Sequence, residues 1–585
     1  MAKNHYLQLI VFNNCLNLIL DYLKDNKEAL FSCLLVNRLF CQHVIPYLWS
    51  SPFELETNPN KHKLILRTYI SCLCEEEKQQ LINFQIENES LSTPRDYPKY
   101  LEIFNNQHIQ DAVEKFTSTE EKVERTDMKN KKRKIRKLLC KIITNLLINR
   151  TKGFTCVEII SSSSDLNSID IDYTIFPRLS QALSRLQVFE FSGVFSQGIC
   201  QLFTNFAQHI NTIKKLSILL QPQDETLEIT QAITKLIKSQ TKLTSFTITQ
   251  YWDNHPCSKI YSAIDSHSNY LNHLRIEGLA DVEQLLTVLQ NCNNLETLQL
   301  WEFGEIDNDS LFNLKYPGFR IESIKNLYCD GYSPSHSNLT TVGLFLRICG
   351  RNLRMLWLGH VTKELLQDMR EYFPHLNYLS LKIYEELLLD LTKSLPSMPL
   401  ENLILSIIPN FHNYNSFNTT NTALGFTTSS IMKLVKSIPI TLRYFGLDFR
   451  MNKKDFKFFF ENLRVPLNQL AILENSNHDY VLMTVIDYAK RVESLKEFIY
   501  DQSYDHTNFS EEMLEEARTV IPKIRVIKRG KSSICKKYFD IQYYELTYYF
   551  IETTLVKELE IHRNGGLKLF GWKYNFICAL YIILK

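Results

Sequence analysis

The sequence predicts an α/β protein: an N-terminal three-helix module followed by a right-handed solenoid of strand–helix units, with a parallel sheet inside and helices outside. Three observations predict it. The 585 residues exceed what one hydrophobic core normally holds. A short apolar phrase recurs over more than half of the chain. Between phrases the apolar period changes from 2 to about 3.6, as it does between strands and helices.

Composition narrows the class of function. Lys+Arg number 66 and Asp+Glu 64, and this balance argues against a dedicated nucleic-acid-binding protein. The 14 cysteines form no Cys-x-x-Cys pair, so we expect no metal site, and no motif indicates a cofactor. The start of the chain has no secretory signal, which favours the cytoplasm or the nucleus. No apolar run reaches the length that spans a bilayer.

Residues 7–53 are predicted to form a small helical module. An apolar stripe at i, i+4 and i+7 marks its first helix: Leu16, Leu20 and Leu23. A polar break follows, then a second helical run over 30–40, and Pro46 starts a short segment that carries Trp49. Three short helices this apolar exceed what so small a bundle can bury, so the module implies a partner.

Residues 54–185 are predicted to form a mainly helical linker. Their most distinctive feature is a dense basic run over 129–137. It could be a nuclear-import signal or a patch for an acidic partner. The alternative is an ordinary solvated helix face or linker, since Glu120, Glu121 and Glu124 lie close by in the sequence.

The repeats are predicted to run over 186–529. The phrase first reads Leu186, Phe189 and Phe191, and twelve further copies follow, the last at Ile524. Nearly all spacings lie between 23 and 30 residues. One longer spacing contains a polar stretch, Pro409–Thr428, which is interpreted as an inserted loop. One unit buries too little apolar surface to fold alone, so the units are expected to stack.

This phrase, with helices between its copies, resembles the longer form of the leucine-rich repeat. The family's Asn or Cys three residues past the last apolar position occurs here only as Asn475. The resemblance implies a curved solenoid whose sheet lines a concave face. The alternative is a set of ordinary Leu-rich strands in an α/β domain.

The alternation of side chains along a strand predicts which residues line that concave face. They are Gln299 and Trp301, Tyr328 and Asp330, Trp357, and Lys382. Large aromatic side chains on a solvated surface are typical anchors for a protein partner, so these residues are candidate substrate-binding residues. The alternatives are that the rings pack beneath an overhanging loop, or that the strand phase is off by one.

The N-terminal module in turn resembles the F-box of fungal F-box proteins. The resemblance rests on 19–23, 32–40 and 47–49, while Val11 and Phe12 stand where the family usually carries Leu-Pro. It implies docking on a Skp-type adaptor and, through that adaptor, on a cullin. The implied adaptor-binding residues are Leu16, Leu20, Leu23, Leu34, Leu35, Val36 and Trp49.

Together the two resemblances imply the substrate-recognition subunit of a Skp–cullin–F-box ubiquitin ligase, whose repeats bind an unknown protein target. The alternative is a leucine-rich-repeat interaction scaffold with a degenerate F-box. No nucleophile, metal or phosphate-binding motif appears, so we expect no catalytic residue. Residues 530–585 are predicted to cap the solenoid or form a tail, with a hairpin and an apolar run at 576–584.

Overall fold

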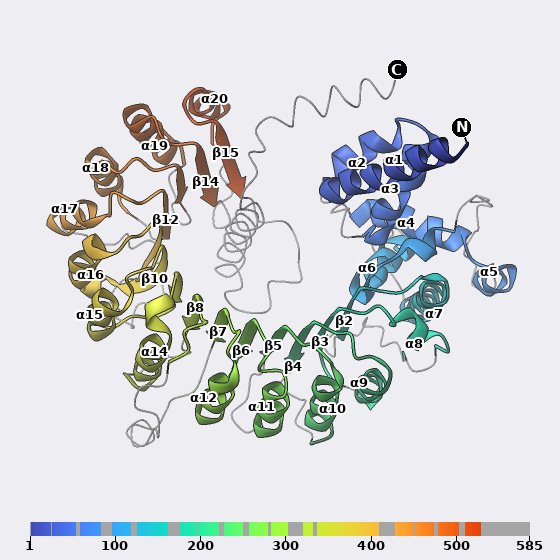
Figure 1. Cartoon of the computed structure of the whole chain (residues 1–585). Coiled ribbons are helices and arrows are strands. Elements are labelled where there is room, and N and C mark those ends of the chain that lie inside the picture. The colour runs from blue at the N-terminus through green and yellow to red at the C-terminus, as the bar shows by residue number, and fades with distance from the viewer. Residues whose placement is uncertain are drawn as a thin grey trace.

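The computed structural model is an arc in which strands line the inner, concave side and helices cover the outer side (Figure 1). The N-terminal helices lie at one end of the arc and the last strands at the other. The structure describes residues 2–24, 26–53, 59–82, 96–118, 126–161, 173, 176–195, 197–220, 227–249, 257–278, 282–301, 320–330, 336–408, 428–448, 451–472, 478–501 and 509–527. Most of the predicted inserted loop and all of 530–585 lie outside these ranges.

One parallel sheet holds the 15 strands of the described residues, which follow one another in chain order. The strands are β1 Ile103–Asn105, β2 Cys156–Ser161, β3 Val188–Gly193, β4 Lys215–Leu220, β5 Ser245–Thr249, β6 His273–Glu277, β7 Thr297–Trp301, β8 Asn326–Asp330, β9 Met355–Leu358, β10 Tyr378–Tyr384, β11 Asn402–Ile408, β12 Tyr444–Asp448, β13 Gln469–Ile472, β14 Glu497–Asp501 and β15 Lys523–Ile527. The register aligns equivalent positions of the phrase, such as Leu298 with Leu327. The predicted α/β solenoid is thus confirmed.

Among the described residues, helices join most of the successive strands. Those of the repeats are α9 Gln197–His209, α10 Leu227–Ser239, α11 Cys257–Asp265, α12 Val282–Asn291, α14 His336–Cys349, α15 Lys363–Tyr372, α16 Leu388–Ser394, α17 Thr428–Ser437, α18 Lys453–Asn462, α19 His478–Val492 and α20 Glu511–Val520, with 3-10 turns η3 Gly350–Asn352, η4 Glu385–Leu387 and η5 Leu395–Ser397. Their apolar faces and the phrase residues of the strands form one continuous core. In α12 an apolar stripe of Val282, Leu285, Leu286 and Leu289 is buried in that core.

The first repeat was predicted to start at residue 186, but the sheet begins earlier in the chain. Strands β1 and β2 pair in parallel with each other and with β3. The phrase is present in β2, where Val157 and Ile159 are buried, but long helical connections separate these first copies and break the spacing. In the first unit Asn106 holds the place of the last apolar residue. Its side chain donates to the Ile160 carbonyl at 2.8 Å and accepts from the Ile160 N–H at 2.7 Å.

The N-terminal part consists of three helices: α1 Ala2–Leu23, α2 Lys27–Leu34 and α3 Arg38–Ser50. The sequence was wrong to join 30–40 into one helix, because Asn37 is extended and its side chain caps α3, accepting from the Phe40 N–H at 2.9 Å. Pro46 lies inside α3 and does not begin a separate segment. The three helices share a small core of their own: Leu16, Leu20, Leu30, Phe40, Val44 and Leu48.

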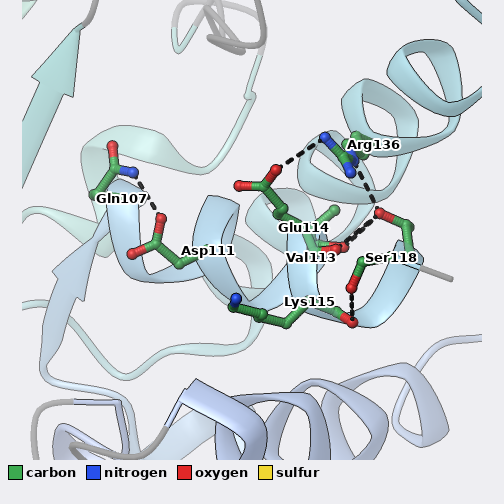
Figure 2. A network of polar contacts seen from close by, with 8 residues as sticks. Gln107, Asp111, Val113, Glu114, Lys115, Ser118 and Arg136 are labelled. Atoms are coloured by element: carbon green, nitrogen blue, oxygen red, sulfur yellow. Dashed lines mark hydrogen bonds and ion pairs between the residues drawn. The ribbon is translucent and has the colours of Figure 1, made fainter. Parts of the chain in front are cut away.

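Between this module and the repeats lie α4 Pro59–Ser71, α5 Glu75–Ile82, η1 Tyr97–Tyr100, α6 Asn106–Thr117, α7 Thr126–Arg150 and α8 Leu179–Ala182. Figure 2 shows how α6 and α7 are joined at the surface. The Arg136 guanidinium on α7 pairs with Glu114 at 3.2 Å and donates to the Thr117 hydroxyl at 2.9 Å. The predicted basic run lies on α7, and its exposed members include Arg133, Lys134 and Lys137.

Candidate functional site

The N-terminal helices carry apolar side chains that their own core leaves in solvent. In the described part of α1–α3 the exposed large apolar residues are Leu18, Tyr22, Phe31, Leu35 and Val36. Leu35 is 83% exposed and Val36 50% exposed. Elsewhere in the described chain such residues occur singly or in twos, so this module has the highest density of them. Exposed apolar surface of this kind indicates a docking site.

Local geometry explains why Leu35 and Val36 face solvent. Helix α2 ends at Leu34, and the N–H groups of Leu35 and Val36 close its last turn on the carbonyls of Ser32 and Cys33, both at 3.2 Å. The cap at Asn37 then starts α3 immediately. The two side chains therefore sit at a helix–helix corner that is fixed at both ends, which holds an apolar edge rigidly for a partner.

The structure separates the predicted adaptor-binding residues into three groups. Leu16 and Leu20 are buried in the core of the module, so they support the surface and do not form it. Leu23 and Leu34 are half-buried against that core. Leu35 and Val36 are open to a partner. Periodicity identified the buried face of α1 and missed Leu18 and Tyr22, because an exposed leucine looks the same in a sequence as a buried one.

Trp49, the last predicted adaptor contact, lies at the junction with the rest of the chain. Its ring centroid is 4.3 Å from that of Tyr97 and 5.5 Å from that of Tyr69. It packs against both the small core of the module and the large core of the solenoid. Its side chain therefore anchors the module, and the backbone supports this join with a bond from the Glu102 N–H to the Ser50 carbonyl at 2.9 Å.

A second candidate surface is the concave face of the sheet. The predicted strand phase is correct, because Gln299, Tyr328 and Trp357 lie side by side in register while their neighbours in the chain enter the main core. The rings of Trp301 and Trp357 stand 4.6 Å apart, centroid to centroid. The side chain of Asp330 lies directly over Gly359, where any added Cβ would meet it.

The concave aromatic residues are not solvated, which corrects the sequence prediction. Trp301 is 5% exposed, Tyr328 1% and Trp357 3%, and Gln299 is buried beside them. Only Asp330 and Lys382 among the predicted substrate-binding residues are half-exposed. The rings belong to a second apolar cluster, the concave stripe, composed of Trp301, Tyr328, Met355, Trp357, Tyr378, Ile404, Tyr444, Ala471 and Ile499.

Charged and polar groups border the concave stripe at both ends. Toward β2 and β3, burial and the nearby Glu158 raise the pKa of Glu190 above its usual range. On β6 the guanidinium of Arg275 pairs with Glu277 at 2.8 Å and lies over the ring of Trp301. At the far end, Glu497 on β14 pairs with two cations of β15, Lys523 at 3.2 Å and Arg525 at 2.5 Å. The concave face is thus apolar along the stripe, from β7 to β14, and polar on the strands before it, from β2 to β6.

Among the described residues no group of three or more His, Cys, Asp or Glu side chains is placed to hold a metal ion. In the same residues, no helix combines the length and the hydropathy that crossing a membrane requires. What the two candidate surfaces share is apolar contact area, which serves binding.

This chain has similarity to solved structures and none to known families by sequence. No protein-family model and no curated protein matches this sequence. Among solved structures, the chain is similar to the leucine-rich-repeat-containing protein LegL7 from Legionella pneumophila, with 13% identity and a TM-score of 0.26, over 54% of this chain and 90% of that one. It is also similar to TLR13, solved as a complex with ssRNA13, with 14% identity and a TM-score of 0.25, over 64% of this chain and 42% of that one. At these values neither likeness carries an inference about function.

Proposed function

We propose that this protein is the substrate-recognition subunit of a Skp–cullin–F-box type ubiquitin ligase. The observation that carries the proposal is the corner of Leu35 and Val36, an exposed apolar edge on a three-helix module fixed to the end of a solenoid. The resemblance of 19–23, 32–40 and 47–49 to an F-box supports it. The partners would be a Skp-type adaptor, a cullin bound through it, and a protein target, in the cytoplasm, the nucleus or both.

In this role the chain performs no chemistry of its own. A rigid solenoid would hold a target at a set distance from the adaptor, which raises the local concentration of target lysines near the activated ubiquitin. Leu35 and Val36 would enter the adaptor interface, with Leu18, Tyr22 and Phe31 as further contacts. The target would meet the concave face, with Asp330 and Lys382 as its accessible polar groups.

The test replaces the exposed corner and leaves the core intact. The double variant Leu35→Asp and Val36→Asp should lose co-purification with a Skp-type adaptor by at least about tenfold, because each charge would have to be buried in the interface. Ile440→Asp is the matched control, since Ile440 is an equally exposed apolar residue of the solenoid. Unchanged adaptor binding by the double variant, with the solenoid folded, would rule out this docking surface.

The second candidate is a leucine-rich-repeat interaction scaffold without a ligase role. Helix α1 runs uninterrupted through Val11 and Phe12, where the F-box family usually carries Leu-Pro, and this favours the scaffold. The two functions are distinguished by reconstitution with adaptor, cullin and ubiquitin-conjugating enzyme. A receptor supports ubiquitin transfer to a co-purified target, and a scaffold binds the target without transfer.

A further inference from the structure

Helix α7 carries a group of exposed basic side chains on one side. They are Arg133, Lys134, Lys137 and Lys141. With 3.6 residues per turn, they fall within about 100° of the helix surface and extend over about 12 Å of its length. These four residues form the basic face. Helix α7 lies in the outer helical layer, between the N-terminal helices and α9 (Figure 1).

The packing of α7 gives the basic face a fixed position. The C-terminal half of the helix enters the main core through Leu139, Ile143 and Leu147, which are fully buried. In the other half, Arg136 reaches across to α6 and pairs with Glu114 (Figure 2). A partner would therefore meet side chains on a preformed helix, and binding would not have to order that helix.

The basic face has no acidic partner in the part of the chain that the structure describes. There, none of its four side chains forms an ion pair or a hydrogen bond. The acidic helix α5 meets α7 beyond the basic face, where the Asn145 side chain donates to Glu77 at 3.4 Å. Lys137 stands four residues from both Arg133 and Lys141, and like charges at this spacing destabilise a helix. An anionic partner would relieve that repulsion.

We propose that the basic face is a docking site for an acidic peptide segment of a partner protein. The two are complementary in charge and in spacing. Arg133, Lys137 and Lys141 follow one another at about 6 Å along the helix axis, and alternate residues of an extended peptide are about 6.6 Å apart. Acidic residues at every second position of such a segment would thus lie opposite successive cations.

Two other classes of anionic partner fit this surface less well. Single-stranded nucleic acid is bound through aromatic side chains on which its bases stack, and a membrane surface is bound through apolar side chains beside the cations. None of the exposed large apolar residues in the described chain lies on α6 or α7. The face is also only about 12 Å long, which matches a few residues of extended peptide.

The basic face is a third surface, separate from the corner of Leu35 and Val36 and from the concave face. The inference therefore does not depend on the adaptor docking proposed above. Its consequence concerns protein partners. An acidic segment bound to α7 would tether the protein that carries it beside the first strands, which raises the local concentration of that protein near the concave face.

Fluorescence anisotropy of labelled peptides with the full chain tests the proposal. The probe is a peptide of alternating Glu and Ser residues, and the reference peptide has Gln in place of Glu. The full chain should bind the probe and not the reference. The variant with Arg133→Gln, Lys134→Gln, Lys137→Gln and Lys141→Gln should bind the probe at least about tenfold more weakly. Gln preserves the helix, because its helix propensity is close to that of Lys and Arg.

The matched control removes the same charge from other helices. It changes four exposed lysines on α10 and α17: Lys235→Gln, Lys238→Gln, Lys433→Gln and Lys436→Gln. This variant should bind the probe as the unmodified chain does. A third variant keeps the charge of the basic face, with Lys134→Arg, Lys137→Arg and Lys141→Arg, and it should also bind normally.

Four results would overturn the proposal by excluding a peptide site at the basic face. They are no binding of the probe, unchanged binding by the Gln variant of the basic face, equal weakening in the control, and tighter binding of a single-stranded oligonucleotide or of phosphatidylserine vesicles through these residues. A fifth is binding of the probe only after Glu120, Glu121 and Glu124 are replaced by Gln, which would assign the basic face to acidic residues of this chain.

Discussion

At the scale of single residues, two half-buried histidines, His273 and His360, are uncharged at neutral pH. Burial, together with the cations Arg275 and Lys215, lowers the pKa of His273 to about 4. Burial and the nearby Lys382 lower the pKa of His360 to about 4 as well, and its ring stacks on that of Tyr384. In an unfolded chain both would titrate near 6.5. Protonation therefore favours unfolding.

This difference predicts acid sensitivity. Because the folded state binds fewer protons between pH 6.5 and pH 4, stability should be full above about pH 6.5 and decrease as the pH falls through that range. We expect at most about 3 kcal/mol for each histidine, because one pKa unit is worth about 1.4 kcal/mol and each pKa is lowered from 6.5 to about 4. Urea unfolding at several pH values measures it, and the double variant His273→Gln and His360→Gln should show a flatter profile. An unchanged slope in that variant would assign the acid sensitivity to other groups.

At the scale of the element, the contact between neighbouring repeats depends on backbone as well as side chains. The end of β3 is Gly193, with φ of 135°, paired in register with Ser161 at the end of β2. A Cβ at this glycine would lie 1.8 Å from the Ser161 carbonyl oxygen. Only glycine allows the two strands to remain paired here.

Gly193→Ala should therefore destabilise the protein by at least about 2 kcal/mol, because the strand must shift away and its left-handed φ is strained. Gly343→Ala is the matched control. Gly343 lies within helix α14, and an added Cβ would be 3.4 Å from the nearest atom, so this change should be neutral or stabilise slightly. Denaturant midpoints of the two variants compare them directly, and equal midpoints would refute the assignment.

At the scale of the whole molecule, the N-terminal module is joined to the solenoid around Trp49, by its ring contacts and by the backbone bond between Glu102 and Ser50. Helices α1 to α3 have a core of six buried residues, too small to be stable without further support. Trp49 joins that core to the continuous core of the solenoid through Tyr69 and Tyr97. The exposed corner at Leu35 and Val36 is therefore held relative to the arc through this junction.

Trp49→Ala should release the module. We expect a loss of about 3 kcal/mol from this contact and faster amide exchange throughout α1 to α3, with exchange in β3 to β14 unchanged. Phe31→Ala serves as the control, since Phe31 is an exposed aromatic of the same module and should leave exchange unaffected. Hydrogen exchange read by mass spectrometry resolves the two regions. Protection of α1 to α3 that survived the loss of Trp49 would show that the module is held elsewhere.

The sequence predicted the features that repeat along the chain and missed those that occur once. The phrase from Leu186 to Tyr500 marks strands correctly because each copy buries the same face in the same core. The last copy was placed three residues too late, since β15 pairs Ile524 with Phe498, the second position of the phrase. The first unit escaped detection because Asn106 replaces an apolar residue with two hydrogen bonds to Ile160, which no hydrophobic pattern reveals. Leu16 and Leu20 were predicted to contact an adaptor, but both are buried in the core of the N-terminal module.

The sequence by itself determined the repeat, the strand phase and the placement of Gln299, Tyr328 and Trp357 on one face, since periodicity follows from backbone geometry. Only the tertiary structure decided which apolar residues meet solvent. Exposure depends on what packs above a side chain, and that neighbour is distant in the chain. For this reason Leu35 is open to a partner, while Trp357, predicted to be equally accessible, is covered.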